Sequence, residues 1–375
     1  MGRVDATAEE LLVAGFLSMQ PAATLISFAR EVGGGVISDS AQQIVLNKCL
    51  GNEVHLRYPS SKAYVRNVLK TVILTAEQEG QEVLESMYET YAVFSQAEQQ
   101  LAERCYKTIT YMIPDETISN LARTLGHERM VKALERKVVT LRVSLNMLDG
   151  DTGYFIWPAG LLLTEFLLSY PELVKGYSCL ELGSGTGICG VWLARLCCSK
   201  LVLTDGSLSA LANLRHNLTI NGFRQPSDED LSPNDGQFQV ECRQLLWETA
   251  TEEELASFNA EVIIGADLIY DPAPLVPVLA GLLRPKSKPS QEANGIQRSE
   301  NQIGHASDGK EVIHPVAYMA QAIRNLNTLE SYLSMVSQAG LQLVDITESI
   351  SFQKCLPELL GFDRGQVRIH KVFYP

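Results

Sequence analysis

The feature that most constrains the fold is a glycine-rich turn, CLELGSGTGICG, which runs from residue 179 to residue 190. It follows an apolar stretch typical of a buried strand, and a helical pattern begins near Ile188. Gly183, Gly185 and Gly187 let the backbone turn sharply and approach a ligand, because glycine has no Cβ. The helix that follows offers free N–H groups at its start. A strand, a glycine turn and a helix in this order predict a nucleotide-binding α/β unit.

Strand and helix patterns alternate along the chain after about Arg136. The predicted strands are 178–182, 201–205, 239–245, 261–266, 316–322, 341–348 and 367–373. Such alternation predicts a Rossmann-like, seven-stranded and mostly parallel sheet with helices on both faces. The last two strands have no strong helix between them, so we expect an antiparallel hairpin at the edge of the sheet.

The first part of the chain has helical patterns instead. Thr7 and Glu10 form the pattern of a capping box before an apolar run, and Val65, Leu69 and Val72 fall on one stripe of a predicted helix. Such stripes indicate core packing, not chemistry. We therefore predict a small helical domain over residues 1–130 and an α/β domain over residues 131–375.

One segment, about 285–312, interrupts the α/β pattern. It is rich in Ser, Gln, Asn, Lys and Glu and nearly lacks large apolar residues. A segment of this composition buries too little surface to order itself, so the sequence predicts a disordered insertion.

Composition limits the partners and the compartment. Of the 375 residues, 46% are hydrophobic and 20% are charged, as in ordinary globular proteins, and the net charge of -13 argues against a nucleic acid partner. The eight cysteines include no C-x-x-C pair, which favours reduced, buried thiols over a metal site or a disulfide framework. Acidic residues precede the N-terminal apolar patch, and no window is long enough to span a membrane. We expect a cytoplasmic monomer with no metal and no membrane partner.

The glycine turn leaves two cofactors open. Residues 185–190 match the G-x-G-x-x-G pattern of dinucleotide enzymes, and Asp205 lies at the spacing from which a carboxylate binds ribose hydroxyls. A nicotinamide-dependent oxidoreductase is therefore one alternative. Glu181 favours S-adenosylmethionine, because a carboxylate directly before the glycines can face an ammonium group but would repel a pyrophosphate.

A second motif, EVIIGADLIYDPAP, begins at residue 261 and places Asp267 and Tyr270 after an apolar strand. A carboxylate at the end of such a strand is costly unless it is paired, solvated or used. Taken alone, Asp267 can simply cap the next turn.

These motifs resemble a known family. TGYFIWPAG, LELGSGTG, LTDGS, NLRHNLTINGF, LLWE and GADLIYDP stand in the order and spacing of the family-16 protein methyltransferases, from about Thr152 to the C-terminus. Upstream, RYPSSKAYVRNVLKTVI and LESMYETYAVF resemble the helical domain of elongation factor 2 lysine methyltransferases.

The resemblance implies a class I (seven-β-strand) methyltransferase that uses S-adenosylmethionine and modifies a lysine of elongation factor 2. It implies a lysine channel at the Asp-x-x-Tyr motif, with Asp267 and Tyr270 as catalytic residues. The implied cofactor-binding residues are Trp157, Glu181, Gly183, Ser184, Gly185, Gly187, Asp205, Trp247 and Ala266. Trp192 is expected in the core. A methyltransferase for another protein, or a non-catalytic adaptor, are further alternatives.

Overall fold

The computed structural model describes residues 6–96, 104–125, 137–145, 152–196, 198–223, 240–287, 303–305, 311–351, 353–360 and 362–375. The chain divides into two compact units. The first unit contains residues 1–117, 135–155 and 354–362, and the second contains residues 118–134, 156–353 and 363–375. The chain thus passes between the units several times. The division into a helical domain over residues 1–130 and an α/β domain over residues 131–375 stays a prediction.

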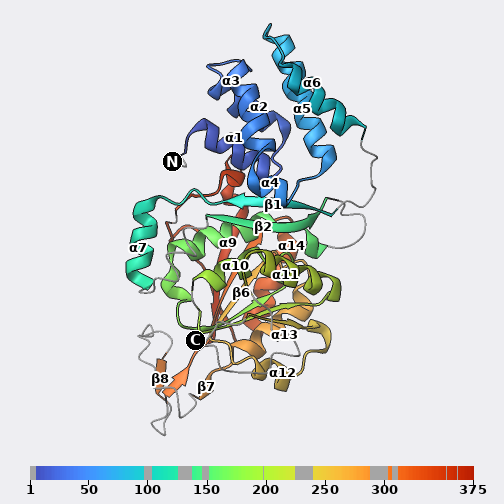
Figure 1. The fold of residues 1–375 in the computed structure, drawn as a ribbon. Helices are drawn as coiled ribbons and strands as arrows, with labels where there is room; N and C mark the ends of the chain where they lie inside the picture. The colour runs from blue at the N-terminus through green and yellow to red at the C-terminus, as the bar shows by residue number, and fades with distance from the viewer. Residues whose placement is uncertain are drawn as a thin grey trace, which may run out of the picture. The chain divides into compact units, whose positions relative to one another are not determined.

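The first unit is mainly helical (Figure 1). Its helices are α1 (Ala8–Leu17), α2 (Ala22–Val32), α3 (Asp39–Ile44), the π-helix η1 (Val45–Leu50), α4 (Glu53–Arg57), α5 (Lys62–Gln78) and α6 (Glu85–Ser95). The predicted capping box is confirmed, since Glu10 N–H donates to Thr7 Oγ1 at 3.2 Å and Thr7 N–H donates to Glu10 Oε2 at 2.8 Å. The predicted stripe on α5 is buried.

A two-stranded antiparallel sheet belongs to the same unit. β1 (Arg104–Thr110) pairs with β2 (Val138–Ser144), and the hydroxyls of Thr108 and Thr140 lie 2.9 Å apart across the pair. The alternating pattern of β2 predicts this strand, but β1 is absent from the helical interpretation of residues 1–130. That interpretation is wrong at β1, because its partner lies about thirty residues further along the chain. Helix α7 (Asp115–Leu125) follows β1.

The second unit contains the predicted seven-stranded sheet. Its strands are β3 (Ser178–Leu182), β4 (Lys200–Asp205), β5 (Val240–Gln244), β6 (Val262–Ala266), β10 (Val316–Ala322), β11 (Gln342–Asp345) and β12 (Val367–Phe373). The spatial order is β11-β12-β10-β6-β3-β4-β5. Strands β3 to β6 and β10 run parallel, whereas β12 is antiparallel to both β10 and β11. The Rossmann-like fold and the edge hairpin are therefore confirmed.

Two groups of helices flank this sheet (Figure 1). The helices are α9 (Pro158–Ser169), α10 (Ile188–Arg195), α11 (Leu208–Ile220), α12 (Glu252–Ser257), α13 (Pro272–Leu283) and α14 (Leu326–Gln338), with the short 3₁₀ turns η3 (Thr152–Tyr154), η4 (Pro171–Leu173), η5 (Trp247–Thr249), η7 (Pro357–Leu359) and η8 (Arg364–Gln366). α9 packs against α10, and α13 packs between α12 and α14. Trp192 on α10 is fully buried, as predicted. A buried apolar cluster joins β3, β6 and β10 to α13 and α14.

The cap of α14 differs from the motif-based expectation. Asn327 and Glu330 have the spacing of a capping box, but Asn325 is the N-cap. The backbone of Asn325 is extended, and its Oδ1 accepts hydrogen bonds from the N–H groups of Asn327 (2.9 Å) and Thr328 (3.4 Å). The helix consequently begins two residues earlier than that spacing predicts.

The segment predicted to be disordered is only partly described. Its strands β7 (Lys286–Ser287), β8 (Ile303–His305) and β9 (Glu311–Ile313) form a small antiparallel sheet in the order β7-β9-β8. Residues 288–302 and 306–310 lie outside the described residues, so the prediction of disorder is untested there. Strand pairing at the edges needs only backbone groups, and a lack of large apolar side chains does not prevent it.

Six of the described cysteines are buried (Cys49, Cys105, Cys179, Cys189, Cys198 and Cys355), in agreement with the buried thiols predicted. Among the described residues, no helix is long and apolar enough to cross a membrane.

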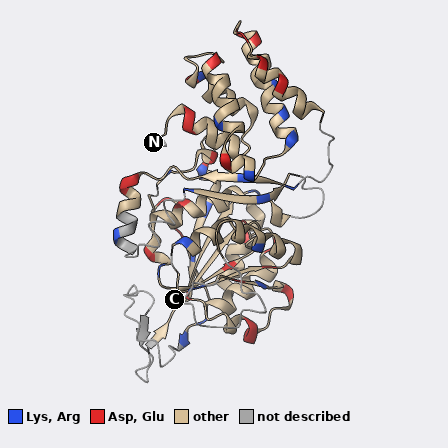
Figure 2. Ribbon diagram, viewed as in Figure 1, with Lys and Arg blue, Asp and Glu red and all other residues tan. Residues whose placement is uncertain are grey.

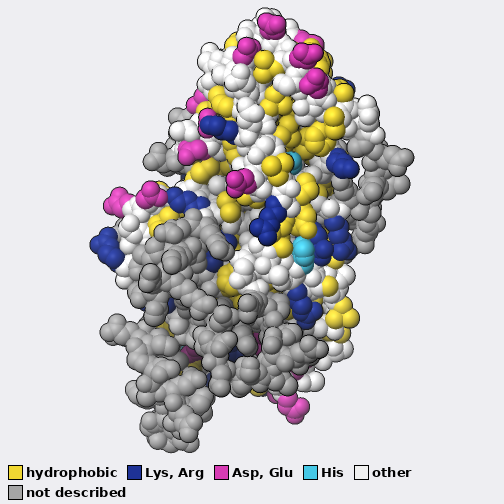
Figure 3. Space-filling model, in the orientation of Figure 1, with side chains coloured by type: hydrophobic (Ala, Val, Ile, Leu, Met, Phe, Trp, Pro, Cys, Tyr) yellow, Lys and Arg dark blue, Asp and Glu magenta, His cyan; other side chains and the backbone are white. Residues whose placement is uncertain are grey.

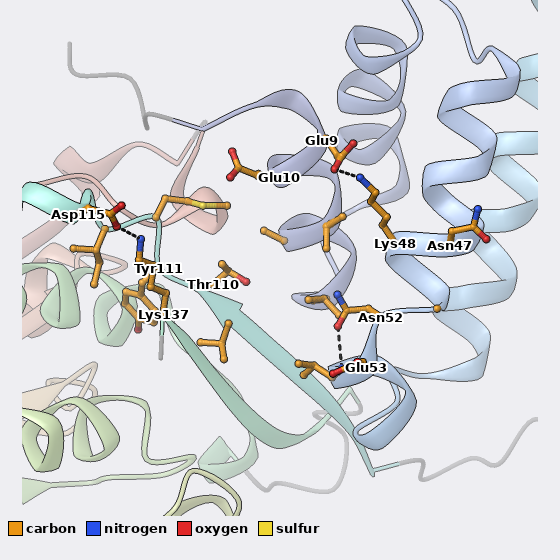
Figure 4. Close-up of a pocket in the computed structure, with 18 of the residues that line it drawn as sticks. Glu9, Glu10, Asn47, Lys48, Asn52, Glu53, Thr110, Tyr111, Asp115 and Lys137 are labelled. Carbon is orange, nitrogen blue, oxygen red and sulfur yellow. Dashed lines mark hydrogen bonds and ion pairs between the residues drawn. The ribbon is translucent and has the colours of Figure 1, made fainter. Parts of the chain in front are cut away.

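The first unit also has an open cavity of about 860 Å³ near α1, η1 and the end of β1 (Figure 4). Two of its four acidic side chains form ion pairs with its two lysines. Lys48 pairs with Glu9, and Lys137 Nζ lies 2.9 Å from Asp115 Oδ1. Glu10 is used in the capping box of α1.

Candidate active site

The candidate site lies at the carboxyl end of the parallel strands. β3 has β4 on one side and β6 on the other, so the connections after β3 and β6 leave toward opposite sides of the sheet. In open α/β sheets, ligands bind in the crevice at such a switch point. The motifs singled out from the sequence lie at the carboxyl ends of β3, β4 and β6, and the fold therefore brings them to one edge.

The glycine turn has the backbone that its sequence predicts. Gly183, Gly185 and Gly187 have φ angles of 57°, 49° and 86°, in the left-handed region that favours glycine. A Cβ on Gly183 would lie 2.5 Å from Leu268 Cδ2, and one on Gly187 would lie 2.4 Å from Leu214 Cδ1. Helix α10 begins directly after this turn, so its first N–H groups point toward the same edge.

Glu181 is a buried acid just before the turn. Only 3% of the residue is exposed, and its Oε2 has no hydrogen-bond partner among the described atoms. Burial raises the pKa of Glu181 to about 8, against the opposing effect of the Ser184 hydroxyl and the Cys189 thiol, and the charge of Asp205 raises it further. The Ser184 hydroxyl is also buried without a partner among the described residues. Two polar atoms left unsatisfied in this way suit a polar ligand, because burying them alone is costly.

Asp205 ties the glycine turn to the end of β4. Its Oδ2 accepts a hydrogen bond from Gly185 N–H at 2.9 Å, and its Oδ1 accepts one from Ser207 N–H at 3.0 Å. The backbone of Ser184 also donates to the Thr204 carbonyl at 2.8 Å. The carboxylate is half-buried, so it lies at the surface of the turn where a ligand can reach it.

Replacing Asp205 with Ala should weaken binding of S-adenosylmethionine by about 1.5–3 kcal/mol, because charged hydrogen bonds to two ribose hydroxyls would be lost. The variant should also melt at a lower temperature, since the N–H groups of Gly185 and Ser207 lose their acceptor. Calorimetric titration and thermal unfolding of the same sample measure both effects. Unchanged affinity in a destabilised variant would limit Asp205 to a structural role.

Asp267 directly follows β6, and both of its carboxylate oxygens accept hydrogen bonds. Its φ angle is 57°, and its N–H donates to the Ala320 carbonyl at 2.8 Å. Oδ1 accepts from Ala322 N–H at 3.0 Å and from Gln321 Nε2 at 3.3 Å, while Oδ2 accepts from Arg324 Nη2 at 3.0 Å. Burial raises the pKa of Asp267, whereas the Ala322 N–H and the Arg324 guanidinium oppose the rise. The carboxylate at the end of an apolar strand is thus paired.

Arg324 is a residue of this site that the sequence did not single out. Its guanidinium carbon lies 4.8 Å from the centre of the Trp157 ring while it bonds Asp267. Arg324 thereby links the residue before α9 to the residue after β6. The sequence indicates Arg324 only through its position two residues beyond β10, because the carboxyl ends of parallel strands meet at one edge of the sheet.

Two aromatic rings lie close together beside this edge. The rings of Tyr270 and Trp247 are stacked with centroids 6.4 Å apart, and 71% of Tyr270 is exposed. Although Tyr270 is exposed overall, neighbouring atoms remove some solvent from its phenol and raise the pKa of Tyr270, as do the charges of Asp205, Glu248 and Asp271. Ala266, the last residue of β6, lies beside the start of α9, where a Cβ on Gly160 would be 3.9 Å away.

Comparison with known proteins shows which family the region around this site resembles. Residues 135–299 match a family model described as lysine methyltransferase. This region is therefore similar to lysine methyltransferases. The methyltransferase class predicted from the sequence is thus confirmed, and the nicotinamide oxidoreductase alternative is not favoured.

The methyltransferase is similar to several curated proteins over much of its length. It is 26% identical over 339 residues to the protein-lysine N-methyltransferase EEF2KMT of Homo sapiens, which covers 89% of each chain. It is 35% identical over 158 residues to the protein-lysine N-methyltransferase EFM3 of Chaetomium thermophilum, covering 40% of this chain and 44% of that one. An O-methyltransferase from Bacillus cereus, solved in complex with SAH, is 14% identical, covers 69% of this chain and 97% of that chain, and has a TM-score of 0.33.

Proposed function

We propose that the protein is an S-adenosylmethionine-dependent protein-lysine N-methyltransferase that modifies a lysine of translation elongation factor 2. The observation that carries the proposal is the set of three carboxylates, Glu181, Asp205 and Asp267, which lie at or next to the carboxyl ends of three neighbouring strands around a glycine turn. They occur in a chain whose residues 135–299 match lysine methyltransferases. The human relative named EEF2KMT, similar over 89% of its length, supports the choice of substrate.

The residues at the glycine turn fit S-adenosylmethionine, which supplies the methyl group on a sulfonium when bound. Glu181 and Ser184 bring buried polar atoms without partners to the place where an ammonium group can be satisfied. The three glycines leave room for the backbone to approach the ligand, and Asp205 can accept hydrogen bonds from ribose hydroxyls. As further contacts we propose Trp157, Trp247 and Ala266, with Trp247 beside the adenine.

The chemistry requires a neutral amine, aligned in a site with little water. Positive charge moves onto the amine nitrogen as it accepts the methyl group, so a fixed negative charge nearby stabilises the transition state. We propose that Asp267 provides this charge and that Tyr270 shapes the channel to it. A strong base is not required, because burial lowers the pKa of a lysine amine and water can take the proton.

The raised pKa of Glu181 predicts that cofactor binding releases a proton. The unliganded protein keeps Glu181 neutral below about pH 8, and a cationic ammonium beside it favours the carboxylate. Between about pH 5.5 and 7.5, affinity should therefore increase with pH, by up to about tenfold per unit. Calorimetry in buffers with different ionisation enthalpies measures the released proton. Glu181→Gln should abolish the dependence, and a flat profile in the parent protein would refute the assignment.

The stability of the unliganded protein should change with pH in the opposite direction to cofactor affinity. Because the folded-state pKa of Glu181 is above the unfolded value of 4.5, its contribution is fully present below about pH 4.5 and is lost as pH rises toward about 8. Cofactor should consequently raise the melting temperature most at the alkaline end of this window. Thermal unfolding with and without S-adenosylmethionine gives this comparison.

The first unit offers surface suited to a folded protein substrate. Apolar side chains gather on the visible face of its helices, and acidic and basic side chains lie interspersed along them (Figures 2 and 3). Leu56 and Val93 are 69% and 68% exposed. We expect a Leu56→Ser and Val93→Ser double variant to methylate its protein target about five- to thirtyfold less efficiently, as for removal of interface anchors. Cofactor affinity should stay unchanged.

A matched control for this double variant is Val344→Ser, which removes an exposed apolar side chain from β11. Equal loss of activity in the control would point to general destabilisation. Full activity of the double variant would instead exclude this surface from substrate binding.

The experiment that tests the proposed function is incubation of the purified protein with labelled S-adenosylmethionine and purified elongation factor 2, beside a cytosolic extract. Mass spectrometry then identifies the modified residue. Label on a lysine of elongation factor 2 supports the proposal. Label on a different protein would retain the methyltransferase and overturn its substrate, and no label in either sample would overturn both.

A further inference from the structure

Arg324 contacts both Asp267, which follows β6, and Trp157, which precedes α9. We propose that Arg324 is a positioning residue for methyl transfer, which holds the Asp267 carboxylate in one orientation and in its charged form. The inference rests on the proposed function, in which Asp267 faces the substrate amine. Two observations define the residue. Its Nη2 lies 3.0 Å from Asp267 Oδ2, and its guanidinium lies over the Trp157 ring at 4.8 Å.

The contacts of Asp267 show why its orientation is narrowly defined. A carboxylate has about four acceptor sites on its two oxygens. Oδ1 already accepts from Ala322 N–H and Gln321 Nε2, and Oδ2 accepts from Arg324. The acceptor site left for a substrate amine is therefore on Oδ2, beside the guanidinium. Arg324 thus determines where an amine can meet the carboxylate.

The difference in burial between the partners explains why the charge of Asp267 depends on Arg324. The side chain of Asp267 is 2% exposed, whereas that of Arg324 is 52% exposed. A buried carboxylate without a charged partner favours its protonated form. Among the described residues, Arg324 is the charged group that lowers the pKa of Asp267, and the other opposing contact is the Ala322 N–H. Gln321 is a neutral amide.

Trp157 supplies the second fixed contact. An arginine that is half-exposed would otherwise sample many rotamers, and stacking on an indole face limits them. Trp157 stands directly before α9 as its N-cap residue, so its backbone is anchored to that helix. The indole and the carboxylate together hold the guanidinium plane at the edge of the sheet. A lysine at this position would keep the charge but not the planar contact.

Replacing Arg324 with Met tests the charge of Asp267 without any substrate. In the parent protein the pKa of Asp267 is raised by burial, so the stability it contributes is lost as pH rises through that value. Without the guanidinium the loss should extend to higher pH. The difference in melting temperature between parent and Arg324→Met should therefore grow as pH rises through the pKa of Asp267 in the parent protein and then level off. A constant difference at every pH would overturn the proposal.

Arg284→Met is the matched control. Arg284 is 56% exposed and its Nη2 lies 2.8 Å from Glu252, but that carboxylate is 75% exposed. Hydrogen bonding and the charge of Arg284 lower the pKa of Glu252, so the stability of this pair is fully present above about pH 4.5. The melting difference for this variant should be constant above about pH 5. A slope like that of Arg324→Met would show that loss of any arginine causes the effect.

The second readout is the pH profile of kcat/KM with elongation factor 2 as acceptor. Arg324→Met should lose about tenfold or more at the acidic end and recover to within about threefold at the alkaline end. Arg324→Lys should keep the parent profile, because the charge remains. A uniform loss at every pH would reduce Arg324 to a structural residue. A lower KM in Arg324→Met would show that the guanidinium competes with the substrate amine, and would also overturn the proposal.

The two readouts separate the failure of this inference from the failure of the proposed function. If elongation factor 2 is not methylated by the parent protein, the melting experiment still decides whether Arg324 keeps Asp267 charged. If elongation factor 2 is methylated and the melting difference is flat, the substrate assignment stands and the role of Arg324 is wrong.

Discussion

Gly185→Val is expected to abolish detectable binding of S-adenosylmethionine. The φ angle of Gly185 is 49°, where a β-branched residue is strained by about 1–3 kcal/mol, and its N–H donates to Asp205. A valine would both oppose this backbone and place a Cβ on the side of the turn that we propose for the ligand. We expect an affinity loss of at least about a hundredfold, since strain and collision add. Isothermal titration measures it.

Gly340→Val provides the comparison for this variant. Gly340 has a φ angle of 73°, and a Cβ there would meet nothing within 4 Å. The control therefore carries the same kind of backbone strain outside the glycine turn. It should lower the melting temperature while cofactor affinity stays near that of the parent. Parent-like affinity in Gly185→Val would remove the turn from the cofactor site.

Asp267→Asn is expected to lower turnover about thirty- to a thousandfold, through the loss of roughly 2–4 kcal/mol of transition-state stabilisation. Asparagine tolerates the positive φ angle at this position, and its carbonyl oxygen can still accept from Ala322 N–H. The substitution thus removes the charge and largely preserves the backbone. Cofactor affinity should change much less, because Glu181 and Asp205 provide the charged contacts proposed for the cofactor. Turnover and cofactor binding are measured on the same variant.

Asp271→Asn is the matched change four residues further on. Asp271 is the N-cap of α13 and accepts from Ala273 N–H at 3.2 Å, a role that asparagine fills equally well. Its turnover should be unchanged. Equal loss of turnover and cofactor affinity in Asp267→Asn would place Asp267 in the cofactor site. Parent-like turnover would leave it the structural role of joining the ends of β6 and β10.

The sequence around Asp267 predicts its place at the end of a strand, but only the structure shows its hydrogen-bond partners. The apolar run before it predicts the strand, and the Asp-x-x-Tyr motif suggests a role. The motif does not contain the partners, because Gln321, Ala322 and Arg324 come from a segment more than fifty residues away. Those partners reach Asp267 only because β10 pairs with β6 in parallel.

The local features of the sequence determined most of the sheet. All seven strands were predicted, because runs of apolar residues between helical patterns are a short-range signal. The turn at Gly183, Gly185 and Gly187 was likewise readable, since positive φ angles strongly favour glycine. The acids at positions 181, 205 and 267 can be recognised in the sequence because each lies at or next to the carboxyl end of a predicted strand.

Only the tertiary structure decided the features that depend on distant partners. β1 exists through its pairing with β2, and residues 354–362 belong with the N-terminal helices although a long segment separates them in the chain. The ion pair between Asp267 and Arg324, and the stacking of Arg324 on Trp157, join three segments with no shared local pattern. Propensity and periodicity act over a few residues, whereas these contacts arise when the sheet assembles and brings its strand ends to one edge.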